Sequence, residues 1–452
     1  MSACRLIVAV VLSLLASTAH SAEFRVATFS ADVTIPLGHR CMGILPTKAT
    51  QIDDPLEAHG FVLLGSDRPI VLVALDWCEL RNGAYDRWRD MLADAAGTTR
   101  ERVLVSCLHQ HDAPVVDTDA QALLDDVGLE KELCDPAFQE ACLQRVADEL
   151  RRSLGGARRV THLGLGQAKV EQVASNRRVE LVNRRVTFDR GSASGGVAMH
   201  RDAPEGTIDP FLKTLSFWDG ETPLLAVHAY AVHPMSYYGK GGVSADFVGL
   251  ARRHRQADDP QIAQIYLSGC SGNVTAGKYN DGSPAMRGVL AERLHDAMRR
   301  AWNDVKRVPL EQVTFRKTDI ELPFHEGDEF RREALEKTLR SEAAPIADRI
   351  LAAMSLASRD RLERDPTIDL PCVDFGSAQL VLLPGESFVG YQLLAQKTRP
   401  DSFVFCAGYG ECWPGYIPTQ SAFDDGFNHG WRWSGKDSPD RMEAAIQRVL
   451  DR

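Results

Sequence analysis

The chain has 452 residues, of which 44% are hydrophobic and 25% are charged, a composition typical of a globular protein. Its 62 acidic residues outnumber its 52 basic residues and give a formal net charge of −10 at pH 7. Because binding to phosphate backbones needs a basic surface field, this balance excludes nucleic acid as the expected partner. A lipid substrate is not excluded, because an apolar groove rather than net charge recognises a lipid.

The N-terminal residues have the pattern of a signal peptide. Arg5 precedes an apolar run over residues 6–16, and the small residues Ala19 and Ser21 indicate a cleavage site. We therefore expect residues 1–21 to be removed and the mature protein to be secreted or periplasmic. The apolar run has about half the length of a transmembrane helix, and no other stretch predicts a membrane span. An uncleaved membrane anchor is the alternative interpretation.

Short apolar strands alternate with polar helical segments along the mature chain, a pattern that predicts an α/β fold. The expected strands cover residues 60–64, 70–75, 103–106, 224–228, 262–267, 378–383 and 402–407. The expected helices cover residues 84–96, 136–154, 284–305 and 387–396. Residues 326–363 are dense in Arg and Glu and predict one or two amphipathic surface helices, interrupted near Pro345. Together these elements predict a layered, mixed β-sheet core with flanking helices, in a single domain over residues 22–452.

Nine cysteines lie in the mature chain. In an exported protein we expect some of them to form disulfides, and an odd number leaves at least one thiol without an intramolecular partner. Cys78, Cys107 and Cys270 lie at the ends of apolar strands, which predicts buried thiols rather than metal ligands. The chain has no C-x-x-C motif, so a structural zinc knuckle is not expected.

The segment 106–114 reads SCLHQHDAP and directly follows an expected strand. Because side chains alternate along a strand, His109 and His111 would project from the same face at its end. Two such imidazoles can share a metal ion, or one can hold the metal while the other moves protons. A pair of hydrogen-bonded loop histidines is the alternative interpretation.

This segment and several others resemble, in content and in order, the motifs of the neutral/alkaline ceramidase family. The other matching segments are ADVTIP (31–36), VLVALD (71–76), AVHP (231–234) with SAD (244–246), LSGCSGNVT (267–275), PGE (384–386) and YIPT (416–419). The resemblance spans residues 24–435 and implies the fold of the ceramidase catalytic domain. Many members of the family carry a C-terminal immunoglobulin-like domain, which we do not expect in this chain.

The resemblance also implies a chemistry. One zinc ion would polarise an amide carbonyl and lower the pKa of its bound water to about 7, so that water attacks an N-acyl amide bond. At the matching positions, the zinc ligands would be His109, His233, Glu386 and Tyr416. His111 would orient the substrate or transfer a proton, and Arg177 would contact polar groups of the substrate. A ceramide-like lipid or a small-molecule amide is the expected substrate, and a lipid substrate would bring the protein into peripheral contact with a lipid surface.

Each of these positions also has a structural interpretation when it is taken alone. His233 precedes a proline and could be a loop histidine, and His228, five residues earlier, is the rival ligand. Glu386 could complement the dipole at a helix N-terminus. Tyr416 could belong to an aromatic packing corner, and Arg177 could be a solvated surface charge.

The segment 267–275 contains the main departure from the family. Asn273 and Thr275 stand where the family has Asp and Ser. Thr275 keeps a hydroxyl that could donate a hydrogen bond to the reacting amide, although its extra methyl group narrows the site. Ser271 offers an alternative reading as the nucleophile of a serine esterase, but Asn273 replaces the last glycine of the G-x-S-x-G motif. A binding protein that keeps the metal site without turnover is the second alternative.

Overall fold

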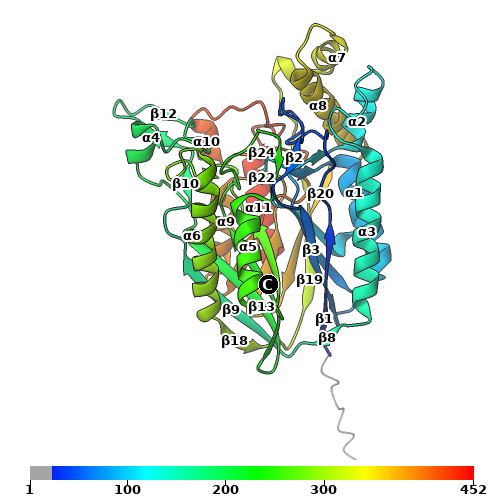
Figure 1. The fold of residues 1–452 in the computed structure, drawn as a ribbon, viewed down its shortest axis with the longest axis vertical. Coiled ribbons are helices and arrows are strands. Elements are labelled where there is room, and N and C mark those ends of the chain that lie inside the picture. Colours follow the sequence, from blue (N-terminus) through cyan, green and yellow to red (C-terminus); the bar gives the residue numbers. More distant parts are fainter. Residues whose placement is uncertain (1–22, 452) are drawn as a thin grey trace, which may run out of the picture.

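Three β-sheets form the core of the structure, a computed structural model that describes residues 23–451 (Figure 1). In spatial order, the first sheet contains β6 (Val103–Cys107), β4 (Ile70–Leu75), β3 (Glu57–Leu64), β1 (Arg25–Asp32) and β8 (Arg158–Arg159). The second sheet contains β16 (Ala263–Ser268), β14 (Thr222–Tyr230), β13 (Phe211–Asp219), β9 (His162–Lys169) and β18 (Lys306–Pro309). The third contains β19 (Thr314–Glu321), β20 (Thr367–Asp374), β21 (Ala378–Leu382) and β23 (Phe403–Ala407).

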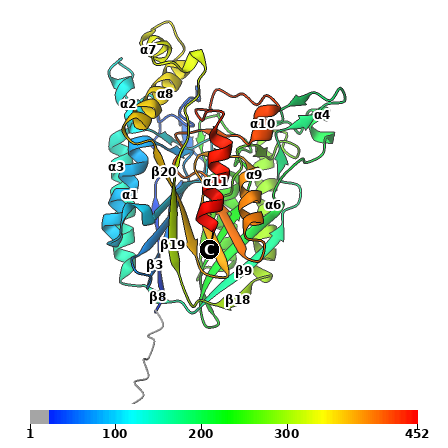
Figure 2. The same cartoon turned by 180° about the vertical axis from the view of Figure 1, so that it is seen from behind.

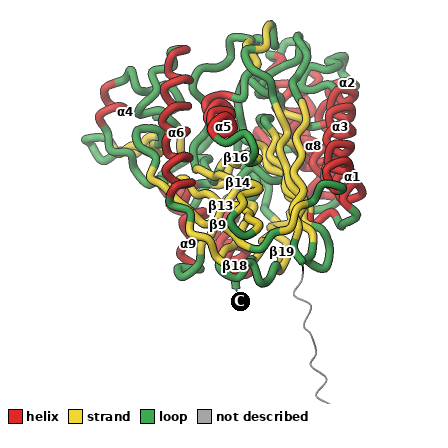
Figure 3. Tube along the Cα trace, turned by 60° about the horizontal axis from the view of Figure 1, so that its bottom comes forward, coloured by secondary structure: helices red, strands yellow, loops and turns green. Residues whose placement is uncertain are grey.

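Each sheet is covered by its own pair of helices (Figures 1 and 2). The first pair is α1 (Asn82–Ala96) and α3 (Pro136–Leu154), the second is α5 (Asp246–Asp258) and α6 (Pro284–Asn303), and the third is α9 (Val389–Thr398) and α11 (Ser438–Leu450). In the tilted view of Figure 3, the strands lie between the helices of the first pair on one side and those of the second pair on the other. This arrangement confirms the layered α/β fold that the sequence predicts.

The strand β4 shows why the sheets stack. All six of its side chains are buried, and they alternate between two apolar clusters. The first set is Val71, Val73 and Leu75, and the second is Ile70, Leu72 and Ala74. Since successive side chains point to opposite faces, an uninterrupted apolar strand must be covered on both sides. One face of the first sheet therefore packs on its helices, and the other packs toward the second sheet.

The expected elements are present, with boundaries that differ by a few residues. The strand over residues 70–75 and the helix over residues 136–154 have the predicted bounds. The segment 326–363 forms α7 (Arg332–Arg340) and α8 (Ile346–Arg364), and Pro345 is the N-cap residue of α8. However, α8 is not a surface helix, because its central residues are buried and Ser355 accepts a hydrogen bond from the Trp433 indole at 2.7 Å.

The expectation of disulfides is wrong. All nine cysteines within residues 23–451 are free and buried. Cys78, Cys107 and Cys270 are buried thiols, as the sequence predicts, and burial raises the pKa of each well above its usual value. The cysteines therefore act as small apolar residues of the core.

Two further sequence predictions concern membranes. Within the described part of the chain, we find no helix with the length and apolarity needed to cross a membrane. The expected signal peptide over residues 1–21 lies outside the described residues.

Candidate metal centre

The site residues follow the ends of parallel strands. Each sheet has one pair of parallel neighbours: β4 with β6, β14 with β16, and β21 with β23. His109 comes two residues after β6, His233 three residues after β14, and Glu386 four residues after β21. In α/β folds, loops at the carboxyl ends of parallel strands commonly form the ligand site. Each of the three sheets thus contributes one of these residues.

Two imidazoles meet one carboxylate at this point. The Nε2 atoms of His109 and His233 lie 3.4 Å and 2.9 Å from Oε2 of Glu386, and all three side chains are buried. The three ligand-type atoms lie within 4.8 Å of one another. Among residues 23–451, the second carboxylate oxygen, Oε1, has no hydrogen-bond partner. An orphaned buried oxygen of this kind is costly unless a ligand satisfies it.

The outer hydrogen bonds of the imidazoles fix their protonation. His109 Nδ1 lies 3.1 Å from the carbonyl oxygen of Cys78, and His233 Nδ1 lies 2.6 Å from that of Ser271. Because a carbonyl only accepts, each Nδ1 carries a proton, and a neutral imidazole then has its lone pair on Nε2. When both imidazoles are neutral, both lone pairs face the Glu386 carboxylate, which is also an acceptor. A proton on His109 Nε2 relieves this contact and accounts for the raised pKa of His109. A cation would convert this unfavourable contact into coordination, and His nitrogen with carboxylate oxygen is a donor set that suits zinc.

The pKa values are those of a ligand set. Burial would raise the pKa of Glu386, but His109 and His233 outweigh it and hold this pKa well below its usual value. Burial lowers the pKa of His233 to about 4, although its hydrogen bond with Glu386 opposes the shift. Burial would also lower the pKa of His109, but the charge of Glu386 raises it. Near neutral pH, Glu386 is therefore an anion and His233 is neutral, which are the forms that coordinate metals.

Tyr416 completes the set of four predicted ligands. The two-residue strands β22 (Glu386–Ser387) and β24 (Tyr416–Ile417) pair in parallel, with Glu386 opposite Tyr416. The Tyr416 ring lies 6.2 Å from the His233 ring, and its hydroxyl contacts Glu386. Burial raises the pKa of Tyr416 well above its usual value, so a phenolate at this position would need a cation beside it.

His111 and Arg177 lie beside this cluster. The His111 ring is 5.0 Å from that of His109 and 6.1 Å from that of His233. Its buried Nδ1 has no hydrogen-bond partner in the described part of the chain, and burial holds its pKa well below the usual value. The Arg177 guanidinium lies 5.4 Å from the Tyr416 ring centroid and, within residues 23–451, forms no ion pair.

Comparison with solved structures identifies the fold that carries these residues. No protein family model matches the chain, and no curated protein matches its sequence. The crystal structure of neutral ceramidase from Pseudomonas aeruginosa superposes with a TM-score of 0.68 at 16% identity, over 95% of this chain and 74% of that chain. A ceramidase complexed with C2 gives a TM-score of 0.68 at 15% identity, over 95% of this chain and 75% of that one.

The chain has a ceramidase-like fold. The resemblance in the sequence motifs is thereby confirmed at the level of fold. At 15–16% identity, the comparison shows only that the folds are alike. The roles of individual residues must therefore be argued from the contacts that these residues make.

The hydroxyl groups of Thr275 and Ser271, the two candidate hydroxyls of the sequence analysis, form hydrogen bonds with other parts of the protein. The Thr275 hydroxyl accepts the Gly277 N–H at 3.1 Å and lies 3.3 Å from the Gly191 carbonyl oxygen. The Ser271 hydroxyl lies 2.7 Å from that of Tyr409. His233, the imidazole next to Ser271, bonds its carbonyl rather than its hydroxyl and reaches that hydroxyl only through the Tyr409 phenol, 3.5 Å from Nδ1. Among the described residues, no imidazole therefore contacts the Ser271 hydroxyl directly.

His228, the rival ligand, lies inside β14 and away from the cluster. Its Nδ1 is 2.8 Å from the Thr214 hydroxyl, and its Nε2 is 2.9 Å from Oε1 of Gln264. Both nitrogens are therefore used by neighbouring strands of the second sheet. This confirms the interpretation of His228 as a core-facing histidine.

Several residues around the centre were not found from the sequence. The Tyr409 ring stacks on His109, with centroids 4.6 Å apart, and Oε1 of Glu79 lies 3.9 Å from His109 Nδ1. Trp431 donates its indole N–H to Glu79 at 2.8 Å, and Arg81 donates to the same carboxylate at 2.8 Å. One sequence feature could have revealed two of them. Tyr409 and Glu79, like His109, are polar residues that follow an apolar strand within four residues.

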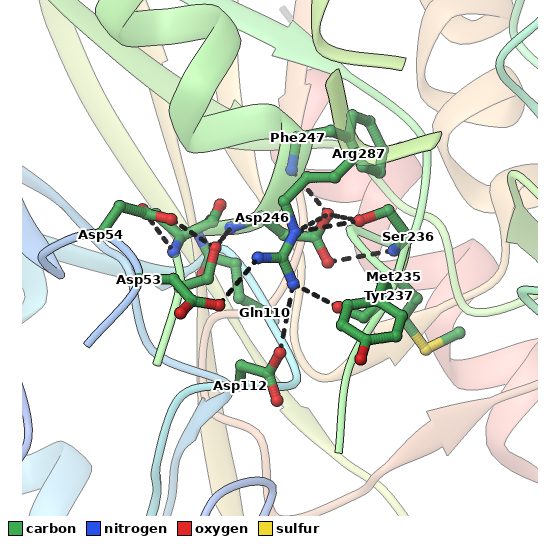
Figure 4. Close-up of polar contacts among 12 residues, drawn as sticks. Asp53, Asp54, Gln110, Asp112, Met235, Ser236, Tyr237, Asp246, Phe247 and Arg287 are labelled. Carbon is green, nitrogen blue, oxygen red and sulfur yellow. Dashed lines mark hydrogen bonds and ion pairs between the residues drawn. The ribbon is translucent and has the colours of Figure 1, made fainter. Parts of the chain in front are cut away.

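A second missed group joins the two histidine loops (Figure 4). Arg287, in the first turn of α6, donates to Asp112 Oδ2 at 3.3 Å and to the Ser236 hydroxyl at 3.3 Å. Asp112 follows His111, and Ser236 lies three residues after His233. Asp246, which has a φ of +52°, accepts the Ser236 N–H at 3.0 Å and lies 3.9 Å from the Arg287 guanidinium. Arg287 thus holds together the loops that carry the imidazoles.

Proposed function

We propose that the protein is an exported, zinc-dependent hydrolase that cleaves an N-acyl amide bond. The observation that carries this proposal is the contact of two imidazole Nε2 atoms with one buried carboxylate whose other oxygen has no hydrogen-bond partner within residues 23–451. The proposed ligands are His109, His233, Glu386 and Tyr416. When bound, zinc would polarise the substrate carbonyl and lower the pKa of a bound water to about 7.

The surrounding residues have roles that follow from their contacts. Within residues 23–451, His111 is buried and its Nδ1 has no hydrogen-bond partner, so this nitrogen can bond the substrate. Because burial keeps the pKa of His111 low, a proton that it carries is readily given to the leaving amine. Arg177 has donors that no carboxylate occupies and can orient the acyl carbonyl beside Tyr416. Thr275 would donate to the developing oxyanion after release from its backbone contacts.

The substrate class follows from the fold and the sequence motifs together. Two solved structures with this fold are described as ceramidases, so we propose a ceramide-like lipid or a related N-acyl amide. Such a lipid substrate brings the protein into contact with membrane or micelle surfaces. We further propose export after removal of residues 1–21, and a single catalytic domain over residues 22–452.

One observation favours a second function, that of a metal-site binding protein without turnover. The Thr275 hydroxyl is held by the Gly277 N–H and by the Gly191 carbonyl, and these contacts compete with donation to a substrate. A hydrolysis assay with zinc-loaded protein separates the two functions. Release of fatty acid or amine from a panel of N-acylated lipids and N-acyl amino acids supports the hydrolase.

Metal analysis tests the proposed centre directly. Purified mature protein should hold close to one equivalent of zinc, and the double variant His109→Ala/His233→Ala should hold none. The variant His228→Ala is the matched control, because it removes an equally buried imidazole that does not contact Glu386. Full zinc content in the double variant would refute the ligand assignment.

A further inference from the structure

A small pocket with basic walls lies at the segment that carries two of the buried tryptophans, Trp431 and Trp433. It has a volume of about 330 Å³ and is lined by His325, Glu326, Gly327, Arg432, Gly435 and Lys436. None of these residues belongs to the proposed metal centre or to its substrate groups. The pocket therefore needs an explanation of its own.

Arg432 is buried in this wall without an ion-pair partner among the described residues, and the exposed carboxylate of Glu329 acts on it only from beyond ion-pair distance. The Arg432 side chain is 4% exposed. Arg81, which is also buried, pairs with Glu79 at 2.8 Å. Arg190 is buried without a carboxylate too, but backbone carbonyls accept from all three of its nitrogens. Arg432 has neither a carboxylate at ion-pair distance nor, in the described chain, a hydrogen-bond partner on its Nε.

Two hydrogen-bond donors converge at the pocket. His325 Nδ1 accepts the Gly327 N–H at 2.9 Å, so the proton of the neutral imidazole is on Nε2. This Nε2–H lies in close contact with Nη2 of Arg432, which is also a donor. The amide oxygen of Asn428 lies 3.3 Å from the same Nη2 and is a hydrogen-bond acceptor for His325. One neutral amide oxygen thus serves two donors. The Ser434 carbonyl accepts from Nη1 of Arg432 at 2.6 Å, but within residues 23–451 no carboxylate lies at ion-pair distance from this guanidinium.

The electrostatics of the pocket point the same way. Burial lowers the pKa of Arg432 to about 10, and burial together with the charge of Arg432 lowers the pKa of His325. Lys436 adds an exposed ammonium at the rim, and within residues 23–451 it has no ion pair. Glu326 is the one acidic residue of the lining, and it is exposed to solvent. A negatively charged ligand with several acceptor oxygens would relieve both the desolvated charge and the facing donors.

We propose that this pocket binds an oxyanion of the phosphate type, with His325 Nε2–H and Arg432 donating to its oxygens and Lys436 neutralising it from the rim. The ligand is inorganic phosphate or the phosphate of a lipid headgroup, because both present the same oxygens. This inference does not depend on the proposed hydrolase function.

The pocket is connected to Tyr416 through the backbone. The Tyr416 N–H donates to the Trp431 carbonyl at 3.1 Å, and the Ser434 hydroxyl donates to the Tyr416 carbonyl at 2.7 Å. Gly415 and Arg432 also form a β-bridge. An anion that holds Arg432 therefore holds the segment on which Tyr416 is anchored.

Calorimetric titration of the full-length mature protein with inorganic phosphate at pH 7 tests the site. We expect saturable binding of one equivalent, weakened about 10-fold by Lys436→Gln, as loss of one charged contact of about 1.4 kcal/mol implies. His325→Phe keeps the stacking on Phe330 but removes the donor, and should weaken binding similarly. Lys306→Gln, an exposed lysine of β18, is the control and should leave the affinity unchanged.

Further experiments distinguish free inorganic phosphate from the phosphate of a lipid headgroup. Co-sedimentation with phosphatidylcholine vesicles, with and without phosphatidic acid, identifies a lipid headgroup if only the acidic vesicles bind and Lys436→Gln releases them. Phosphate binding without vesicle binding identifies the free ion. Two results would overturn the inference: no binding of either probe, or phosphate binding that is equal in Lys436→Gln and wild type, as expected for phosphate bound at the metal centre.

Discussion

Arg287 offers the sharpest test of how the two histidine loops are held. The Arg287→Ala variant removes the only cation drawn among the carboxylates of Asp53, Asp112 and Asp246 (Figure 4). The side chains of Asp112 and Asp246 are only 5% and 3% exposed, so water cannot replace the lost guanidinium fully. The variant should therefore destabilise the fold and also loosen the metal centre.

The size of the expected loss in the free energy of unfolding follows from the burial of the two carboxylates and from their distances to Arg287. Removing one partner of a buried ion pair costs about 3–5 kcal/mol. The contacts of 3.3 Å and 3.9 Å are longer than a tight ion pair, so we expect about 3 kcal/mol. With an unfolding entropy of roughly 0.9 kcal/mol/K for a chain of this length, the melting temperature should fall by about 3 °C. Zinc affinity should fall about 10-fold or more, as for other groups that hold metal ligands in place.

The loss of stability in Arg287→Ala should depend on pH, and the pKa of Asp112 determines in which direction. Burial raises the pKa of Asp112 to about 7, although Arg287 lowers it. Because this folded value is above the unfolded value of about 3.9, the contribution of Asp112 to stability is complete below about pH 4 and is lost as the pH rises through 7. Without Arg287, the pKa of Asp112 in the folded protein rises further. The stability of the variant therefore continues to fall with pH beyond the range in which that of the wild type falls. The difference between wild type and Arg287→Ala should therefore be larger at pH 8 than at pH 5.

Chemical denaturation at both pH values, combined with zinc competition by a chelator, checks these expectations. Arg300→Ala is the control, since Arg300 lies on the same helix in an exposed ion pair with Asp296 and should change stability by less than about 1 kcal/mol. Equal losses at pH 5 and pH 8, or a loss no greater than that of Arg300→Ala, would refute the reasoning.

Two further predictions concern the residues that the sequence left open. His228→Ala should keep zinc but lower the free energy of unfolding by about 1–3 kcal/mol, because Thr214 and Gln264 lose a buried partner; loss of zinc from this variant would transfer the ligand role to His228. Thr275→Val should keep zinc and lower kcat about 10²–10³-fold, as for an oxyanion donor, whereas Thr275→Ser should stay near wild type. An unchanged rate in Thr275→Val would remove Thr275 from the site.

Local sequence patterns were sufficient for much of the core, whereas the proposed ligands came from the resemblance to the family's motifs. The apolar strand over residues 70–75 and the helix over 136–154, which begins with Pro136 after the N-cap residue Asp135, carry their signals within their own residues. His109 and Glu386 were found because each closely follows an apolar strand in a recognisable motif. The strand β19 was missed, because its mostly polar, half-exposed side chains lack an apolar period.

The partners of the site could not be found in the same way. Arg287 lies 175 residues from Asp112 along the chain, and Tyr409 stacks on His109 from another sheet. Their positions depend on how the sheets meet, which no local pattern encodes. The cysteines were misjudged for a related reason. An exported chain favours disulfides, yet all nine thiols within residues 23–451 are free and buried in this core.

The origin of the three central residues in three different sheets has a consequence for folding. His233 and Glu386 are 153 residues apart in sequence, so bringing them together requires the closure of a very long loop. Neither a single sheet nor any pair of sheets contains the complete set. The proposed metal centre could therefore form only after all three sheets have docked, and zinc affinity would then measure that last assembly step. A metal concentration 1,000 times its dissociation constant would add about 4 kcal/mol to the stability of the docked state alone.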